Sequence, residues 1–537
     1  MAPSAQACGR PALTGPRARR FMGTLLIAVA VHLTVLGASL ASFTGAKTAG
    51  PQALESATLA TPTGLVAANG GCSAGETQKT NVSATWTASA EKPDANGNAM
   101  INGYKVWRST SSEGAYSSVG ATGIATSFTN INPSGAPTPQ VFVGNGAVAT
   151  VHAVNTLTEA GTSITTGTIG TEPNGMAVTP EGTKVVVAEG ASHQAQIIAV
   201  ASDTVTTTVA IPAGGSESRP DAVAITPNGL TAYVVDGANK LVYPITISSG
   251  ARGAGIAVGT QGDPGAIVVT PNGEEVYVAN YGSHNVSVIS TSTNTVTATV
   301  TIGGATGKPI ALAVTQSSAH VYVADQENAK IDDITTSSHT VSSTITVPSM
   351  TDANVAGGGD TNILAITPNG SKLYVASFTG HKVTDIAIPG DTVTGEIALF
   401  EAATAAPNAL ALTPNGCQLY VHEHAHNVVD VITVSSDALA THVAVAATGD
   451  PTGMSVTPNS ASVYVANTGG PSVSVIATAT NTVSSTLKEA TVGKKPYAVL
   501  ATASPYFYKL QAGHGGWQSP PTASVMYPLG WNQGGWQ

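Results

Sequence analysis

Charge is scarce in this sequence. Asp, Glu, Lys and Arg together make up 10% of the 537 residues, and the formal net charge is -10. Proteins that bind nucleic acid need clusters of Lys and Arg to displace the counterions around phosphates, and the sequence has no such cluster. We therefore expect that nucleic acid is not a partner.

Cysteines and standard catalytic motifs are also scarce. Cys8 lies in the N-terminal segment, while Cys72 and Cys417 are far apart in the sequence and fall in different predicted units. We do not expect a disulfide between them, so stability should come from packing. No GxSxG, HExxH, GxxxxGK[ST] or CxxC motif occurs, which excludes the usual hydrolase, protease, nucleotide-binding and redox signatures. Catalysis by residues that are distant in sequence and come together only in the fold is not excluded.

The N-terminal segment has the composition of an export signal. Four arginines come first: Arg10, Arg17, Arg19 and Arg20. An uncharged run follows over residues 21–43, and small residues then offer cleavage after Ala41 or Ala46. The alternative is an uncleaved anchor, because a run of about 20 uncharged residues can span a bilayer. Both interpretations predict a chain that is secreted or held at the cell surface, with membrane contact only through a retained anchor.

What the sequence does contain is a repeat built on the letters TPNG. The aligned threonines are Thr179, Thr226, Thr270, Thr315, Thr367, Thr413 and Thr457, at intervals of 44 to 52 residues. Several short strands in a period of this length are typical of a propeller blade.

The unit at residues 269–300 shows how a blade would be built. A short apolar strand runs into the turn, where Pro271 presets φ and Gly273 can take a left-handed conformation. The segments EEVYVAN, NVSVIST and NTVTATVTI then alternate as three further strands. Each four-stranded sheet alone would leave apolar faces bare, so the blades must stack around an axis. The TPNG residues are therefore expected to form tight turns, and the repeated segments are expected to be structural scaffold.

The segments YVANYGSHNVSVIS and YVANTGGPSVSVIATATNTV resemble the YVTN family of β-propeller repeats, found in secreted and surface-layer-like proteins. The resemblance covers residues 171–510 and implies an all-β fold with a seven-bladed propeller. The wider group resembles lactonase-type propellers and the propeller of nitrous oxide reductase, but the repeat itself carries no catalytic residues. Two units depart from the pattern: VTQSSAHVYVAD lacks the turn proline and glycine, and VVVAEG lacks the tyrosine.

Residues 61–168 have a different rhythm and resemble a fibronectin type III domain, with Trp86 on the second strand and Tyr104 on the third. Residues 153–163 resemble the last two strands of that β-sandwich. The resemblance implies a spacer or adhesion module. In a rival interpretation, residues 141–155 and the segment KPYAVLATASPYFYKL supply strands of an eighth blade shared between both ends of the chain. We favour seven blades preceded by a sandwich.

These observations divide the chain into five parts. They are a signal peptide or anchor at 1–46, a linker at 47–60, the fibronectin type III-like sandwich at 61–168, the propeller at 169–510 and a tail at 511–537. The tail is rich in Gly and Pro and carries Trp517, Trp531 and Trp536. It is either unstructured or a set of aromatic platforms for sugar rings.

A propeller of this kind has two faces, because consecutive strands of a blade run up and down. The TPNG turns share one face, and the loops after the YVAN strands share the other, where ligands would bind. The segment YVHEHAHNVVD belongs to this second face. If it stays extended, His422, His424 and His426 point the same way and could hold Zn or Cu. The alternative is a set of solvated loop histidines.

Other candidates for this face come from aligned positions of the repeat. His284 and His381 align next to His426. The residue after each YVA includes three carboxylates, Glu189, Asp236 and Asp325. Side chains of this type either cap backbone amides at strand ends or line a polar channel mouth. An insertion at residues 348–362 lies on the same face.

The sequence therefore predicts an exported binding or adhesion protein whose post-YVAN face meets a protein or glycan partner at the cell surface. A lactonase-like or metal-dependent enzyme is one alternative, and a structural surface-layer component is the other. Fold resemblance alone does not separate the three.

Overall fold

The computed structural model describes residues 140–502, apart from 146–149, 166–172, 213–217, 262–263, 351–362, 401–403, 425, 447–450 and 495. It also describes the backbone of eight further strands, five before this range and three after it. The predicted signal segment and linker, residues 1–60, lie outside the described residues. Among the described residues, no helix is both long and apolar enough to cross a membrane.

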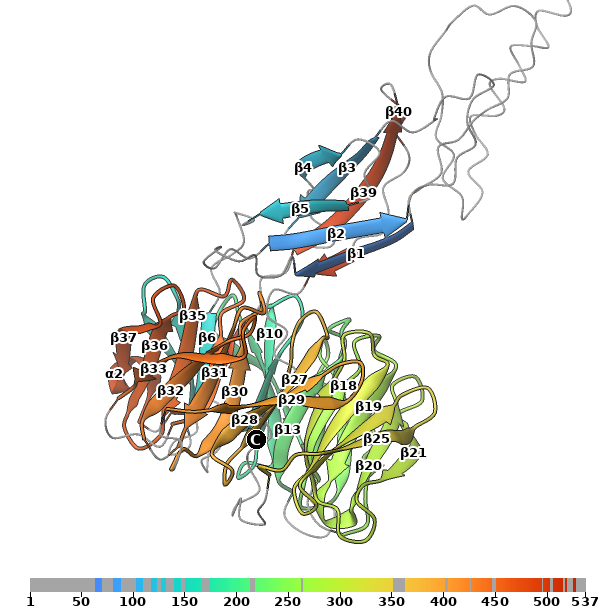
Figure 1. The fold of residues 1–537 in the computed structure, drawn as a ribbon, viewed down its shortest axis with the longest axis vertical. Coiled ribbons are helices and arrows are strands. Elements are labelled where there is room, and N and C mark those ends of the chain that lie inside the picture. Colours follow the sequence, from blue (N-terminus) through green and yellow to red (C-terminus); the bar gives the residue numbers. More distant parts are fainter. Residues whose placement is uncertain are drawn as a thin grey trace, which may run out of the picture.

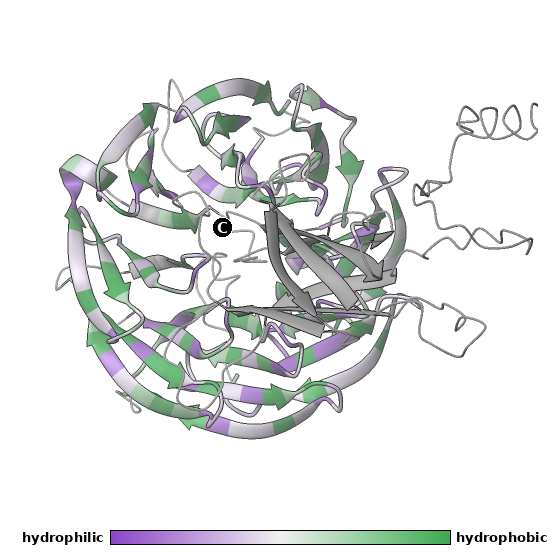
Figure 2. Ribbon diagram, turned by 90° about the horizontal axis from the view of Figure 1, so that it is seen from above, coloured by the Kyte–Doolittle hydropathy of each residue, from purple (hydrophilic) through white to green (hydrophobic). Residues whose placement is uncertain are grey.

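The main body is a β-propeller of eight antiparallel sheets, which Figure 2 shows as a ring seen along its axis. Contacts between neighbouring sheets run mainly through the first strand of each. The strands of the first four blades are, in blade 1, β6 (Gln140–Asn145), β7 (Thr150–Asn155), β8 (Gly161–Thr165) and β38 (Pro496–Ala501); in blade 2, β9 (Pro173–Val178), β10 (Lys184–Glu189), β11 (Gln194–Ala199) and β12 (Thr204–Ala210); in blade 3, β13 (Pro220–Ile225), β14 (Thr231–Asp236), β15 (Leu241–Thr246), β16 (Ala251–Arg252) and β17 (Ile256–Ala257); and in blade 4, β18 (Pro264–Val269), β19 (Glu275–Asn280), β20 (Asn285–Ser290) and β21 (Thr295–Thr301).

The second half of the ring repeats this order. Its strands are, in blade 5, β22 (Pro309–Val314), β23 (His320–Asp325), β24 (Lys330–Thr335) and β25 (Thr340–Thr346); in blade 6, β26 (Leu364–Ile366), β27 (Lys372–Ser377), β28 (Lys382–Ala387) and β29 (Thr392–Ala398); in blade 7, β30 (Pro407–Leu412), β31 (Gln418–Glu423), β32 (Val428–Thr433) and β33 (Ala438–Ala444); and in blade 8, β34 (Pro451–Val456), β35 (Ser462–Asn467), β36 (Ser472–Ala477) and β37 (Thr482–Lys488). Two short helices, η1 (Tyr281–Ser283) and α2 (Glu489–Val492), lie in connections.

The prediction of seven blades is wrong, and the eight-bladed alternative is confirmed. The closing blade takes β38 from the end of the propeller sequence and β6, β7 and β8 from its beginning, with Pro496 opposite Asn145. Residues 153–163, which were expected to finish the sandwich, therefore belong to β7 and β8. The reason is that β6 and β7 have the sequence pattern of a second and a third blade strand, while the first strand of their blade lies at the other end of the propeller sequence, where Pro496 pairs with Asn145. The propeller begins at Gln140 rather than at residue 169.

The remaining strands form two sheets beside the propeller (Figure 1). One sheet contains β1 (Thr63–Asn69), β2 (Asn81–Thr87) and β5 (Ser127–Ile131); the other contains β4 (Ser117–Thr122), β3 (Gly103–Ser109), β39 (Tyr506–His514), β40 (Trp517–Gln518) and β41 (Val525–Tyr527). Strand β39 pairs with β3 across the whole propeller sequence. The propeller is thus inserted between β5 and β39, and part of the predicted tail is strand. The fibronectin type III resemblance stays a prediction.

The structure confirms that the TPNG residues form tight turns. In blade 4 the Thr270 hydroxyl donates to Asn272 Oδ1 at 2.6 Å and accepts the backbone N–H of Glu275 at 3.1 Å. Gly273 has a φ of 75°, a left-handed conformation that glycine adopts without steric cost. Cys417, next to the corresponding turn of blade 7, is disulfide-bonded, and its partner lies outside the described residues. This corrects the expectation that the cysteines form no disulfide.

The repeated tyrosine of the second strand joins each blade to the next. Six of these rings are at most 1% exposed: Tyr233, Tyr277, Tyr322, Tyr374, Tyr420 and Tyr464. The Tyr374 hydroxyl donates to Asp437 Oδ1 at 2.6 Å, and the Tyr420 hydroxyl donates to Asn481 Oδ1 at 2.6 Å. Both acceptors lie in the turn between the third and fourth strands of the following blade. Their φ values are 49° and 51°, and Asp and Asn tolerate that conformation better than most residues.

Departures from this tyrosine contact are matched by changes in the partner turn. In blade 5 the turn position is His339, and Glu275 bridges the gap by accepting from Tyr277 at 2.8 Å and from His339 Nε2 at 2.6 Å. Blade 2 has Val186 in place of the tyrosine, and the facing turn of blade 3 has Gly250 with a φ of 69°. The repeated segments therefore form the scaffold that joins neighbouring blades into the ring.

Candidate functional site

The two ends of the propeller sequence lie on the TPNG face. Strand β6 begins there and β38 ends there, and Gln140 N–H donates to Thr502 Oγ1 at 2.9 Å to hold the two ends together. The strands that precede and follow the propeller therefore attach at this face. The opposite face, which we call the YVAN face, carries the loops after the second strands and the connections that enter the first strands.

The carboxylates predicted for the YVAN face are buried and cap strand ends. Asp236 and Asp325 are both 0% exposed. Asp236 Oδ1 accepts the backbone N–H of Arg219 at 2.8 Å, and Asp325 Oδ1 accepts that of Lys308 at 2.8 Å. Glu189 occupies the equivalent position and is 2% exposed. Asp236 and Asp325 thus hold the first strand of their blade to the second strand, and the burial of all three side chains means that they do not form an open carboxylate ring.

The aligned histidines hold the connections between blades. His284 and His381 both have a φ of 57°. His284 Nδ1 lies 2.5 Å from the carbonyl oxygen of Gly307, and His381 Nδ1 contacts the carbonyl oxygen of Ala405. Because a carbonyl oxygen can only accept, the proton of each imidazole belongs on Nδ1. His193 makes the same contact with Ser218. Each of these three histidines therefore has a structural role: it occupies a turn and bonds a buried backbone carbonyl group.

The run of three histidines does not converge. Strand β31 ends at Glu423, so the alternation that would align the three rings stops after His422. His424 lies in the turn, with its ring centroid 6.3 Å from that of Phe378. His426 Nε2 lies 3.2 Å from the hydroxyl of Thr404. Within the described ranges, no group of three or more His, Cys, Asp or Glu is placed to hold a metal ion, so nothing here supports the predicted Zn or Cu site.

His422 is instead a core residue. It occupies a position where the other seven second strands carry Ala, Val or Gly, and its side chain is 0% exposed. Its Nδ1 lies 2.5 Å from Asn408 Oδ1. Burial, with a smaller contribution from the charge of His424, lowers the pKa of His422 to about 3. The imidazole is therefore neutral, and it donates from Nδ1 to the Asn408 amide oxygen.

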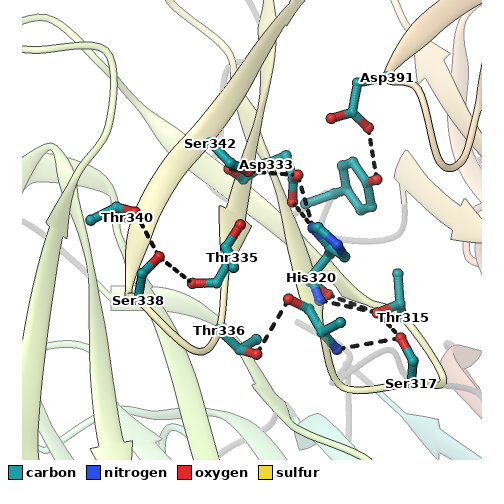
Figure 3. A network of polar contacts seen from close by, with 12 residues as sticks. Thr315, Ser317, His320, Asp333, Thr335, Thr336, Ser338, Thr340, Ser342 and Asp391 are labelled. Carbon is teal, nitrogen blue, oxygen red and sulfur yellow. Dashed lines mark hydrogen bonds and ion pairs between the residues drawn. The ribbon is translucent and has the colours of Figure 1, made fainter.

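A network on the TPNG face contains Ser, His and Asp but lacks the order of a catalytic triad (Figure 3). His320 Nδ1 lies 2.9 Å from Asp333 Oδ2, and the Ser342 hydroxyl donates to the same oxygen at 2.8 Å. In a nucleophilic site the hydroxyl would bond the imidazole, which would remove its proton. Here both groups share one carboxylate, whose pKa burial raises. The network fixes strands of blade 5.

A small pocket opens on the YVAN face between blades 5, 6 and 7. It is lined by Ile310, Gln326, Met350, Ile363, Ala376, Ser377, Phe378, Thr379, Pro407 and Asn408. None of these side chains is charged. Gln326 and Asn408 are each 7% exposed, and Phe378 is half-buried.

The sequence did not predict this pocket, although the pocket lies on the face for which ligand binding was predicted. Gln326 and Phe378 occupy the position directly after the YVAN strand in blades 5 and 6, one residue beyond the predicted carboxylates. Asn408 is the second residue of the first strand in blade 7 and forms a bulge there, because Pro407 pairs with Glu423 while Ala409 pairs with His422. These positions vary strongly between repeats, which was the available signal.

A second polar cluster lies on the YVAN face at blades 2 and 3. Arg219 Nε donates to Asp221 Oδ2 at 2.9 Å, and Asn174 Nδ2 donates to Asp221 Oδ1 at 3.2 Å. The Arg219 side chain is 49% exposed and that of Asp221 is 9% exposed. Each group has a partner, so the cluster joins two first strands and offers little unused bonding capacity.

Comparison with known proteins supports the fold alone. No family model and no curated protein matches the chain. Among solved structures, it is similar to dihydro-heme d1 dehydrogenase NirN in complex with DHE, at TM-score 0.53 and 10% identity over 68% of this chain and 76% of that chain. Kuenenia stuttgartiensis hydrazine synthase matches at TM-score 0.44 and 19% identity over 57% and 96%. The Cps50 (Swd1) β-propeller domain of Myceliophteria thermophila matches at TM-score 0.44 and 11% identity over 54% and 92%.

Proposed function

We propose that the chain is an exported β-propeller that binds a partner at the cell surface through its YVAN face. The observation that carries the proposal is the uncharged pocket on the YVAN face between blades 5, 6 and 7. The charged groups predicted for this face act as caps and clamps, so they favour a binding role over a catalytic one.

The strand topology also supports the YVAN face as the binding face. The strands outside the propeller attach at the TPNG face, so the YVAN face is left free for a partner. Loops anchored in adjacent blades change little on binding, and little conformational entropy is then lost. A propeller held on a second domain by two connections, before β6 and after β38, would present this face as a rigid platform.

The test is saturable binding of the full-length protein to cell envelopes prepared from the source organism. Phe378→Ala alters the pocket, while Leu230→Ala changes a leucine that is 59% exposed next to a TPNG turn and serves as the matched control. We expect the pocket variant to weaken binding at least tenfold and the control to bind like the parent protein. Equal binding by both variants would contradict a role of the YVAN face.

Export is tested separately by fractionating cells that express the full chain. We expect the protein outside the cytoplasm, and a variant with Arg17, Arg19 and Arg20 changed to Glu should accumulate inside. A protein that stays cytoplasmic in both forms would refute the localisation that the N-terminal segment predicts.

A further inference from the structure

We propose that the pocket between blades 5, 6 and 7 binds a neutral saccharide. This inference rests on the proposed function and names the class of ligand for the same face. It follows from three features of the pocket: an uncharged lining, two buried amides with unused bonding capacity, and one aromatic ring at the rim.

The lining residues that the structure describes carry no charge, which favours a neutral ligand. A charged group that left water for this pocket would meet no opposite charge among the lining residues, and such transfer is strongly unfavourable. The lining is also not purely apolar, because Gln326, Thr379 and Asn408 contribute amide and hydroxyl groups. A purely apolar ligand would cover these groups without bonding them, which costs about 1–3 kcal/mol for each buried group.

The Gln326 amide is built into the site without a structural task. The side chain is 7% exposed, and it makes no hydrogen bond with any described residue, whereas its backbone N–H donates to the Lys308 carbonyl oxygen at 3.0 Å. The amide atoms are not among the fully enclosed polar atoms that lack a partner, so they face the pocket. An amide offers both donors and an acceptor, the combination that one sugar hydroxyl or a neighbouring pair can satisfy.

The Asn408 amide is oriented by His422. Because the neutral imidazole donates from Nδ1 to Asn408 Oδ1 at 2.5 Å, the amide oxygen is occupied and the NH₂ group is left as a donor. That NH₂ group has no bond to any other described side chain or carbonyl group. The role assigned to His422 is therefore positioning: it fixes which end of the Asn408 amide is available to the ligand.

Phe378 supplies the apolar surface that a sugar ring needs. Its ring is half-buried at the pocket edge, and the His424 ring lies behind it with an interplanar angle of 48°. A pyranose has an apolar face of C–H bonds and a rim of hydroxyls, so it can lie on an aromatic ring while its hydroxyls bond flanking amides. Phe378, Gln326 and Asn408 all line this pocket, so the ring and the two amides are present together.

The experiment begins with the full-length protein on an array of neutral and acidic oligosaccharides. The strongest neutral binder is then titrated by calorimetry into the parent protein and into the variants Phe378→Ala, Gln326→Ala and Asn408→Ala. The control is Tyr281→Ala, which removes the ring that follows the YVAN strand in blade 4, is 39% exposed and does not line the pocket. Thermal melts show that each variant is folded.

We expect Phe378→Ala to weaken the affinity at least tenfold, each amide variant to weaken it about fivefold to tenfold, and Tyr281→Ala to leave it unchanged. His422→Leu should weaken it about as much as Asn408→Ala. His422→Gln, which keeps a donor for Asn408, should restore part of the affinity, an effect that a merely structural role would not produce.

Three results would overturn the inference: no neutral oligosaccharide that binds, binding only to acidic ones, or affinities that the pocket variants leave unchanged. If Phe378→Ala abolishes envelope binding while neutral oligosaccharides fail to bind, the proposed function stands and the saccharide does not. If neither measurement responds to Phe378→Ala, both proposals fail.

Discussion

Acidification should weaken the propeller through one buried side chain, His422. On the same face of β31, Tyr420 packs in a cluster with Met454 and Val456 of blade 8, so His422 points into the contact between blades 7 and 8. An imidazolium at this position would be fully desolvated. Protonation therefore has to wait for unfolding, and the unfolded chain binds one proton that the folded chain does not.

The sign and the size of the effect follow from the two pKa values. The pKa of His422 is about 3 in the folded protein, against 6.5 ordinarily. Below pH 6.5 the unfolded state holds the extra proton, so the free energy of unfolding falls by about 1.4 kcal/mol for each pH unit. The loss from this residue is about 3 kcal/mol at pH 4.5, and it becomes complete near pH 3.

The assay is urea unfolding at several pH values between 7 and 4.5, for the parent protein and for His422→Gln. The glutamine keeps a donor for Asn408 but does not titrate, so the difference in unfolding free energy between the two proteins should shift by about 3 kcal/mol over this range in favour of the variant. His442→Gln, at an exposed position on β33, is the control and should follow the parent. A difference that does not change with pH would refute the assignment of His422 as a buried neutral imidazole.

Three further predictions concern the scaffold. Tyr374→Phe removes a hydroxyl bonded to a carboxylate and should lower the free energy of unfolding by about 2 kcal/mol, whereas Tyr464→Phe, whose hydroxyl makes no hydrogen bond with the described residues, should cost less than half as much in the same urea assay. Removing residues 496–537 deletes the first strand of blade 1 and should abolish the cooperative thermal transition. Removing only 503–537 deletes β39 and should leave the propeller transition within a few degrees while exposing 63–131 to protease; loss of the propeller transition would contradict independent folding of the ring.

The sequence predicted the parts of the fold that depend on local pattern. The TPNG turns, the alternation of the strands and the stacking of blades all follow from residues within one unit, and each was confirmed. The blade count was wrong because β38 and β6 pair in the structure but lie at opposite ends of the propeller sequence. The sequence has seven TPNG turns, and blade 1 has none. In blade 1 the first strand ends at Ala501 and the second begins at Gln140, so no hairpin turn joins them.

The candidate site was predicted less well, for a related reason. The alternation of His422, His424 and His426 would matter only in an extended strand, and β31 ends one residue after His422. His284 and His381 were predicted as polar residues of the YVAN face, but the carbonyl groups they contact belong to the connection that leads to the next blade. A polar side chain that is buried caps a strand end, whereas one that is exposed can bind a ligand. Which of the two applies depends on contacts with neighbouring blades, which the local sequence does not show.

Departures from the repeat fall into two kinds, and the difference between them points to blades 5, 6 and 7. Ser318 replaces the turn glycine of blade 5 with a φ of 61°, but its hydroxyl accepts the backbone N–H of Asn272 in blade 4 at 2.9 Å. Ser460 in blade 8 does the same for Asn415 at 3.1 Å. These substitutions are compensated within the protein, so the scaffold alone explains them.

The departures at the pocket are not compensated in that way. Gln326 places an amide where other blades carry Gly, Thr or an aromatic residue, and no described residue bonds its side chain. Asn408 is oriented by His422, itself the one large side chain at a position of small ones, and its NH₂ group is left over. Neither amide is fully enclosed, because neither is among the buried side-chain atoms that lack a partner. Both reach the pocket, where a ligand hydroxyl can bond them in place of water, and together with one aromatic ring they suit a bound ligand.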